Sequence, residues 1–230
     1  MRLPRRLAKI AAIVPAGKVV ADIGTDHALL PLYLVEQKIA PRAIAVEAKP
    51  KPYRLAEINI SRSSSGHRVE LRLGNGFYAL REEDGAEVAI LAGLGDGTIR
   101  SILLQEAKGK ESIRDFILQP MTRAEAMRCW LAENGYRLTA ESLVLDKGRI
   151  YEIMAVQRGK EQNRNHPYFP FGLLLIEQKE PLMQELITDK IKKTTAALNN
   201  LAKAEEEHEK TRLKFLSRLE RLREVLHLVS

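Results

Sequence analysis

The stretch VVADIGTDHALLP, residues 19–31, decides the fold class of this 230-residue chain. Val19–Ile23 is the largely apolar run typical of a strand buried on both faces of a parallel sheet. Gly24 follows it and can take backbone angles that a side chain forbids. Asp22, Asp26 and His27 are therefore expected at the carboxyl end of this strand, where open α/β sheets bind their ligands.

Apolar runs and helical patterns alternate up to about residue 158, which predicts a parallel sheet with helices on both faces. The predicted strands are Val19–Ile23, Ala43–Val46, Val69–Leu73, Val88–Ala92 and Phe116–Leu118. The predicted helices are a short amphipathic one with Leu3, Leu7, Ile10 and Val14 on one face, then His27–Glu36, Pro52–Ser61, one ending at Leu104, and Arg123–Asn134. The last two strands, Tyr136–Leu145 and Ile150–Val156, flank a hairpin signal and are expected to be antiparallel.

The charge pattern points to a polyanionic partner. The net charge is +7, and residues 180–230 carry ten basic and nine acidic side chains, so nearly all of the excess lies before them. Eight basic residues against three acidic ones lie between Lys38 and Arg72. Nucleic-acid binding and a merely solvated basic surface both explain this stretch and stay open.

The remaining composition indicates a cytoplasmic protein. The single cysteine, Cys129, permits no internal disulfide. The N-terminal apolar run is short and is interrupted by Pro15, so it does not fit a signal peptide, and nothing approaches the length of a transmembrane helix.

Two domains are expected, residues 1–158 and 172–230, joined by a linker over 159–171 that contains Gly159, Pro167 and Pro170. After Pro181 apolar residues recur at intervals of three and four, as in a coiled coil. They are Ile187, Ile191, Leu198, Leu201, Phe215, Leu219, Leu222, Leu226 and Val229. Poor seam residues between them favour two helices folded back, turning within Lys203–Lys210, over one long helix. Such a hairpin would support a bound partner or pair with a second copy, giving a monomer or a weak dimer.

The order of elements over residues 8–158 resembles the class I S-adenosylmethionine-dependent methyltransferase fold, a Rossmann-like sheet with an antiparallel terminal strand. In that fold the loop after the first strand approaches the methionine part of the cofactor, and an acid after the second strand accepts bonds from the ribose hydroxyls. The turns after the third and fourth strands complete the pocket, the third beside the adenine. The cofactor-binding residues implied are Asp22, Gly24, Thr25, Asp26, Glu47, Asn75, Gly76, Gly93, Leu94 and Gly95.

A dinucleotide site is disfavoured. It needs G-x-G-x-x-G, whereas this chain has G-T-D-H-A-L from Gly24. Asp26 would repel a pyrophosphate but tolerates a sulfonium and an amino group. The plainer alternative, that Asp22 and Asp26 only cap the following helix, stays open.

Five strings in order, DIGTDHALLP, AIAVEAKP, LAGLGDGTI, ILQP and RIYEIMAV, resemble the bacterial tRNA adenine-N1-methyltransferase family called TrmK. The resemblance runs over nearly the whole chain, and its most specific parts are the first string and the Tyr151-Glu152 pair. It implies methyl transfer from S-adenosylmethionine to N1 of adenine 22, in the D-loop region of tRNA, with no metal.

Three positions depart from the family's pattern. Asn75 stands where the family has aspartate, and its amide oxygen can still accept from the adenine amino group. Met121 stands where the family tends to have asparagine. Asp96 stands where the family has glycine, and we expect its charge at the lip of the site to affect how the target base enters. These departures support one alternative, a catalytically weak RNA-binding protein that keeps the fold. A methyltransferase acting on protein or a small molecule is a third possibility, but it leaves the basic excess unexplained.

Methylating adenine N1 puts positive charge on the ring, which a nearby carboxylate stabilises. Asp26 is the candidate for this role, and His27 is the alternative proton acceptor or base-orienting group. A flipped-out base also needs a wall, for which Phe77, Tyr78 and Tyr151 are available, although Phe77 and Trp130 fit core packing better. The side chains expected to hold tRNA phosphates are Arg5, Arg6, Lys49, Lys51, Arg54 and Arg62.

Overall fold

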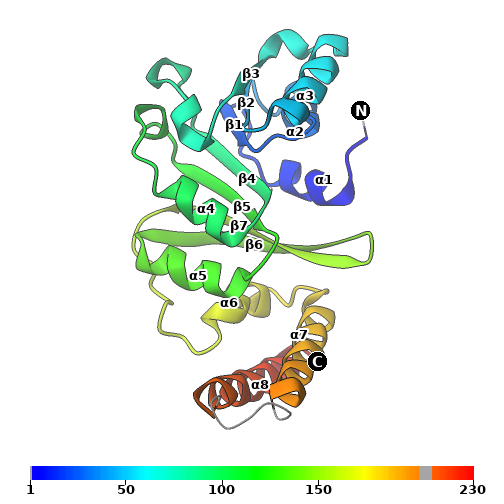
Figure 1. Cartoon of the computed structure of the whole chain (residues 1–230), viewed down its shortest axis with the longest axis vertical. Helices are drawn as coiled ribbons and strands as arrows, with labels where there is room; N and C mark the ends of the chain where they lie inside the picture. Colours follow the sequence, from blue (N-terminus) through cyan, green and yellow to red (C-terminus); the bar gives the residue numbers. More distant parts are fainter. Residues whose placement is uncertain (1, 202–208) are drawn as a thin grey trace. The chain divides into compact units, whose positions relative to one another are not determined.

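The structure, a computed structural model, describes residues 2–201 and 209–230 (Figure 1). It consists of two compact units, Met1–Glu161 and Gln162–Ser230. The boundary falls just past residue 158, where the sequence pattern places the end of the first domain. Among the described helices, none is both long and apolar enough to cross a membrane.

The first unit is built on a seven-stranded sheet with the order β3-β2-β1-β4-β5-β7-β6. Its strands are β1 Val20–Ile23, β2 Ala43–Glu47, β3 Val69–Leu73, β4 Val88–Leu94, β5 Asp115–Pro120, β6 Tyr136–Asp146 and β7 Arg149–Arg158. Its α-helices are α1 Arg5–Ala12, α2 Leu29–Glu36, α3 Pro50–Arg62, α4 Asp96–Leu103 and α5 Ala124–Glu133. The first five strands pair in parallel, and β7 is antiparallel to both β5 and β6. The predicted fold class is confirmed, with most boundaries shifted by one or two residues.

Alternating side chains of the central strands fill two separate cores. In β4, Val88 and Ile90 pack with α1, α2 and α3 on one face, while Ala89 and Leu91 pack with α4 and α5 on the other. Because both faces are covered, the inner strands must be apolar throughout, as their sequences are. Figure 1 shows the helices flanking the sheet in this way.

The strand order reverses between β1 and β4, which are neighbours in the sheet although they are not consecutive in the chain. The crossover connections leave β1 toward one side and β4 toward the other, so the loops at their carboxyl ends diverge. In open α/β sheets this switch point is where ligands bind. It is also where the DIGTDH segment lies.

The β6–β7 hairpin closes the sheet as the sequence predicts. Lys147 and Gly148 both have positive φ, 51° and 74°, as a two-residue hairpin turn requires. Behind the hairpin, Arg128 is fully buried and donates to Glu141 at 2.7 Å and to Glu152 at 2.8 Å. This charge cluster ties α5 to both strands, and the sequence pattern alone did not reveal it.

The second unit is helical and contains α6 Phe169–Glu177, α7 Met183–Leu201 and α8 Glu209–Val229. The predicted pair of helices is confirmed by α7 and α8, which pack side by side with Ile187, Leu219 and Leu222 buried. The predicted turn lies outside the described residues except for its last two. Helix α6 begins inside the segment expected to be a linker. Pro170 lies in its first turn, where proline is tolerated and does not prevent a helix.

Candidate active site

A cleft of about 490 Å³ opens at the carboxyl edge of the sheet, between the loops that follow β1, β2, β3 and β4. Its lining includes nine of the ten residues predicted to bind a cofactor. They are Asp22, Gly24, Thr25, Asp26, Glu47, Asn75, Gly76, Gly93 and Leu94. The structure therefore brings together residues that are up to 72 positions apart in the chain, from Asp22 to Leu94.

Asp22 is buried at the floor of the cleft and accepts a hydrogen bond of 2.6 Å from the Thr25 hydroxyl. Burial raises the pKa of Asp22 from 3.8 to about 6, although the Thr25 hydrogen bond and the charge of Arg6 oppose this rise. The nearby Glu47 carboxylate raises the pKa further. A carboxyl held this way is costly to ionise, and such groups cluster at functional sites.

Glu47 ends β2 and holds two loops with its carboxylate. Its Oε2 accepts from the backbone N–H of Asp26 at 3.3 Å, and its Oε1 accepts from that of Lys49 at 2.8 Å. Its backbone oxygen accepts from Gly74 N–H at 2.9 Å, which ties the turn after β3 to the same strand end. The acidic side chain is thereby fixed in the cleft wall.

The loop after β1 is held in an unusual backbone conformation. Gly24 has a φ of +83°, and a Cβ there would meet the Leu94 side chain at 3.1 Å. Asp26 and Ala28 also have positive φ, 49° and 55°, which costs about 1–3 kcal/mol for a residue with a side chain. Such strain persists where the surroundings impose it, often at functional sites.

Asp26 and His27 stand at the mouth of the cleft and not inside it. The Asp26 side chain is 70% exposed and that of His27 44% exposed, with His27 Nε2 lying 3.7 Å from Asp26 Oδ1. Both are therefore accessible to a macromolecular substrate that docks over the cleft. The backbone oxygen of His27 accepts from the Asn59 side chain at 2.9 Å, which fixes the loop against α3.

The turn after β3 is braced by a residue that the sequence pattern did not single out. Gln105 Oε1 accepts from the backbone N–H of Phe77 at 2.6 Å. A Cβ on Gly76 would lie 2.4 Å from that oxygen, so a side chain there would displace the Gln105 amide, and the φ of +62° also favours glycine. Asn75 is exposed beside this brace and lines the cleft.

Arg6 occupies a different place from the one expected of a phosphate contact. Its side chain lines the cleft, and Nη1 donates to Gln119 Oε1 at 2.6 Å, an oxygen that also accepts from Gly93 N–H at 3.1 Å. The guanidinium carbon of Arg6 lies 5.6 Å from the centre of the Tyr151 ring. Helix α1 therefore contributes to the cleft wall, a role that helical spacing alone does not indicate.

In the turn after β4, the structure does not bring Gly95 and Asp96 into the cleft lining. Gly95 is the N-cap residue of α4, and its backbone oxygen accepts from Ile99 N–H. Asp96 is buried and does not line the cleft either. Its Oδ1 accepts from the Thr122 hydroxyl at 3.0 Å, and its Oδ2 lies 3.4 Å from Arg100 Nη2. The carboxylate of Asp96 is thus held inside the fold by Thr122 and Arg100.

The aromatic side chains divide as their surroundings dictate. Phe77 is fully buried in the core, and Trp130 stacks on Tyr136 with the ring centres 6.5 Å apart, so both are packing residues as predicted. Tyr78 is 65% exposed. The guanidinium carbons of Arg6 and Arg149 lie 5.6 Å and 5.1 Å from the centre of the Tyr151 ring, and Tyr151 and Tyr78 are the candidates for a wall.

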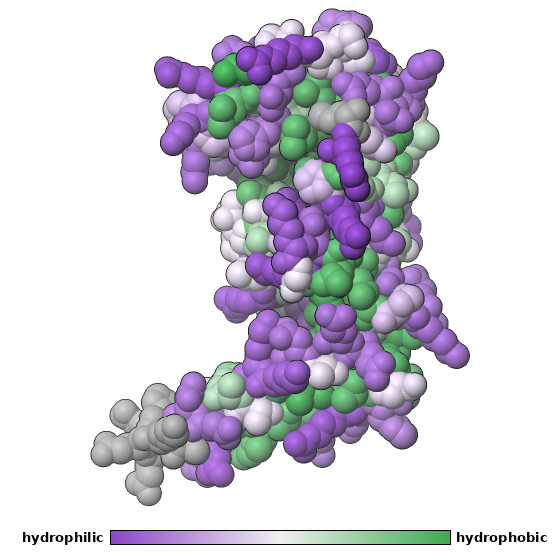
Figure 2. All heavy atoms as spheres, turned by 90° about the vertical axis from the view of Figure 1, so that its right-hand side faces the viewer, coloured by the Kyte–Doolittle hydropathy of each residue, from purple (hydrophilic) through white to green (hydrophobic). Residues whose placement is uncertain are grey.

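The basic stretch contains both paired and unpaired side chains. Arg72 makes two 2.6 Å hydrogen bonds to Asp84, so it belongs to the fold. The other five predicted phosphate contacts are exposed, namely Arg5, Lys49, Lys51, Arg54 and Arg62. Figure 2 views the molecule from the side of α1 and α3, where hydrophilic side chains cover much of the surface. Three of these five side chains belong to α3.

The strand order, the antiparallel hairpin and a cleft with acidic residues after β1 and β2 define a class I S-adenosylmethionine-dependent methyltransferase. Residues 20–224 match the model of a family described as "TrmK: tRNA (adenine(22)-N(1))-methyltransferase". The chain belongs to this family. Its activity is accordingly the transfer of a methyl group from S-adenosylmethionine to N1 of adenine 22 in tRNA.

Known relatives resemble the chain over its whole length. The tRNA (adenine(22)-N(1))-methyltransferase of Bacillus subtilis is 30% identical over 98% of both chains. The crystal structure of the B. subtilis m1A22 tRNA methyltransferase TrmK has a TM-score of 0.83 to this chain, at 98% and 99% coverage. A Streptococcus pneumoniae protein solved in complex with S-adenosyl-L-methionine is 30% identical, with a TM-score of 0.88 and coverage of 98% and 100%.

Proposed function

We propose that the cleft at the β1–β4 switch point binds S-adenosylmethionine, and that Asp26 at its mouth receives adenine 22 of tRNA. The observation that carries this proposal is the hydrogen bond from Asp26 N–H to Glu47 Oε2. It links Glu47, the proposed ligand of the ribose, to Asp26, the proposed contact of the target base, so the two keep a fixed relative position. Such coupling suits a reaction in which orientation of donor and acceptor supplies most of the rate.

The residues of the cleft fit this cofactor. Glu47 has lone pairs left for two ribose hydroxyls, because each of its carboxylate oxygens accepts one bond from a backbone N–H. Gly24 leaves room beside Leu94 that a Cβ would take. A volume of about 490 Å³ is in the range of small-molecule sites. When bound, S-adenosylmethionine would supply the methyl group, and the leaving group would be the neutral thioether formed from its sulfonium.

Asp26 is the residue we assign to the acceptor side. Its exposed carboxylate reaches the exocyclic amine of a flipped-out adenine and stabilises the positive charge that forms on the ring as N1 is methylated. His27, 3.7 Å away, orients that carboxylate or the base. The wall for the base is Tyr151 or Tyr78.

Affinity for tRNA comes from the exposed basic side chains. Lys51, Arg54 and Arg62 lie on α3. Lys49 lines the edge of the cleft, and Arg5 is the first residue of α1. Such contacts hold the RNA through its phosphates without reading the sequence. We place the reaction in the cytoplasm, and we expect the chain to act as a monomer or as a weak dimer through α7 and α8.

The test is incubation with labelled S-adenosylmethionine and bulk bacterial tRNA, followed by nucleoside analysis. We expect 1-methyladenosine with the wild-type chain, and an Asp26→Asn variant should lose about 10²–10³-fold in kcat, since a positioned carboxylate contributes about that much. Cofactor affinity should change by less than about threefold, because Asp26 binds Glu47 through its backbone.

The matched variant His27→Gln separates the two candidates. If Asp26 handles the charge, this variant keeps at least about a tenth of the activity, as expected of an orienting group. A larger loss in His27→Gln than in Asp26→Asn would reverse the assignment. Absence of 1-methyladenosine while the cofactor still binds would favour the alternative of an RNA-binding protein with a vestigial site. That alternative now has less support, because Asp96 lies outside the cleft.

A further inference from the structure

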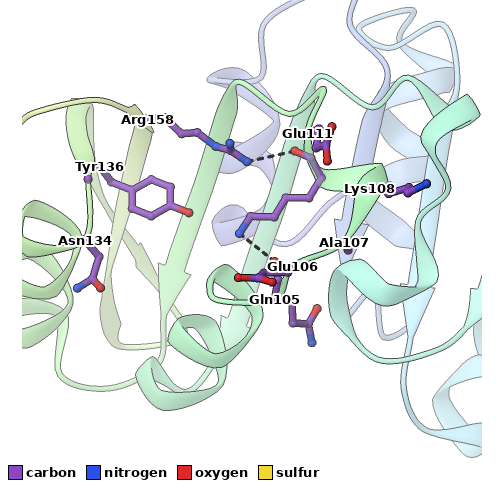
Figure 3. Close-up of a pocket in the computed structure, with 10 residues that line it drawn as sticks. Gln105, Glu106, Ala107, Lys108, Glu111, Asn134, Tyr136 and Arg158 are labelled. Atoms are coloured by element: carbon purple, nitrogen blue, oxygen red, sulfur yellow. Dashed lines mark hydrogen bonds between the residues drawn. The ribbon is translucent and has the colours of Figure 1, made fainter.

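A second cavity, of about 630 Å³, opens at the opposite edge of the same sheet (Figure 3). Its walls come from the segment between α4 and β5, from the turn between α5 and β6, and from the end of β7. These are the amino ends of the parallel strands, so the cavity does not belong to the cofactor cleft. Gln105 lines this cavity with its neighbours and also braces the cofactor cleft.

Two cations line this cavity without a carboxylate partner. Within residues 2–201 and 209–230, no acidic side chain lies within 4.0 Å of Lys110 Nζ or of the Arg158 guanidinium. Lys110 Nζ donates instead to the backbone oxygens of Leu103 and Gln105, and Arg158 Nη2 donates to Lys110 O at 3.4 Å. Elsewhere in this unit the buried cations Arg72 and Arg128 face carboxylates.

The electrostatics of Lys110 also favour an anion. Burial lowers its pKa, and the nearby charge of Arg158 lowers it further, while Glu106 opposes the shift. Two positive groups that repel each other at the same wall are stabilised by an anion placed between them. Glu106 and Glu111 line the cavity as well, but Lys108 leaves the basic residues in excess.

The hydrogen-bonding capacity of the wall matches a phosphate. An ammonium has three N–H groups, and Lys110 has given two of them to backbone oxygens. Arg158 has given one of its five. In Figure 3 the hydroxyl of Tyr136 points toward the side of the cavity on which Gln105 and Glu106 lie. We propose that Lys110 and Arg158, with Tyr136, form a binding site for a phosphate group, carried either by a free small molecule or by the tRNA backbone.

Occupancy of this site would reach the cofactor cleft through two consecutive bonds. Lys110 Nζ holds the backbone oxygen of Gln105 at 3.2 Å, and the Gln105 side chain holds Phe77 N–H at 2.6 Å. An anion that keeps Lys110 charged and fixed would stiffen this brace. Since coupling between two sites is reciprocal, phosphate and cofactor should then strengthen each other's binding. This step rests on the proposed function of the cleft, whereas the phosphate site itself does not.

The first experiment is calorimetric titration of the full chain with pyrophosphate at constant ionic strength. If the site takes a free phosphate compound, we expect binding by the wild type and a loss of at least tenfold in affinity for Arg158→Gln and for Lys110→Gln. Lys160→Gln is the matched control, because it removes the same charge from an exposed side chain that does not line the cavity. Arg158 is exposed, so its variant should keep the fold even if the Lys110 variant melts early.

The second experiment measures tRNA affinity of the same variants. If the phosphate belongs to the tRNA backbone, Arg158→Gln lowers tRNA affinity at least fivefold more than Lys160→Gln does, and pyrophosphate gives no heat. If the phosphate is free, pyrophosphate binds and tRNA affinity is the same in both variants. No pyrophosphate binding, together with equal tRNA affinities, would refute the site.

The third measurement is cofactor affinity with and without saturating pyrophosphate. A twofold to fivefold gain in the wild type, absent in Arg158→Gln, supports the connection through Gln105. An unchanged affinity would refute that connection. At saturating tRNA and without pyrophosphate, formation of 1-methyladenosine should be the same in wild type and Arg158→Gln, so failure of this proposal is distinguishable from failure of the proposed function.

Discussion

The two edges of the sheet hold cavities of opposite electrostatic character. At the carboxyl edge, Asp22 and Glu47 are held by hydrogen bonds from loop residues in fixed orientations. At the amino edge, Lys110 and Arg158 donate to carbonyl oxygens and have no carboxylate partner in the described chain, and Lys110 Nζ also lies 5.5 Å from the centre of the Phe77 ring. A site that orients a donor for chemistry needs groups fixed in advance, whereas a site that only binds an anion needs unneutralised positive charge. This contrast assigns the reaction to the cleft at the carboxyl edge and anion binding to the cavity at the amino edge.

The largest predicted effect concerns the buried charge at the carboxyl edge. The pKa of Asp22 is raised from 3.8 to about 6, so between these values the folded chain keeps a proton that the unfolded chain has lost. Stability from this group is therefore full below about pH 4 and is lost as the pH rises through 6, by up to about 3 kcal/mol.

Replacing Asp22 with Asn should remove this loss. Urea unfolding at pH 5 and pH 7 should show the variant gaining stability relative to the wild type as the pH rises, while its cofactor affinity falls about tenfold because the charge facing the cofactor is gone. A stability difference that does not change with pH would show that Asp22 is not the buried titrating group.

Glu47→Ala tests whether the fixed carboxylate of β2 is a cofactor ligand. The variant loses two acceptors for ribose hydroxyls and releases the Asp26 and Lys49 backbone groups, so we expect a rise of about 10- to 100-fold in the Kd of S-adenosylmethionine. Calorimetry measures it directly. Glu57→Ala, exposed on α3, is the control and should leave the Kd unchanged.

Gln105→Ala tests the residue shared by the two cavities. Loss of the bond to Phe77 N–H frees the turn after β3, and we expect a threefold to tenfold rise in the KM for S-adenosylmethionine, since one hydrogen bond contributes about 1 kcal/mol. The kcat and the KM for tRNA should stay unchanged. Gln105→Glu keeps the accepting oxygen and should restore the KM; failure to do so would assign Gln105 a packing role.

The comparison also shows what sequence reasoning can reach. The strands follow from apolar periodicity, and the resemblance to the methyltransferase fold names nine of the residues that line the cleft, because β1 to β4 bring their carboxyl ends to one edge. The place of Arg6 in the cleft wall and the bond from Phe77 to Gln105 were not predicted. Each depends on one side chain that reaches another loop, and no spacing within a helix encodes such a contact. Arg128 escaped for the same reason, since its partners Glu141 and Glu152 lie on separate strands.

Replacing Asp96 has the smallest predicted effect on activity, and it tests where the cleft ends. Its carboxylate faces Thr122 and Arg100 and does not line the cleft, so Asp96→Asn should leave kcat/KM for tRNA within about threefold. The same variant weakens a buried ion pair at the first turn of α4, which should cost about 1–2 kcal/mol of unfolding free energy. Urea unfolding and the methylation assay on one preparation measure both. A loss of activity beyond tenfold without a change in stability would show that Asp96 lies at the lip of the site, and that the cleft extends to the start of α4.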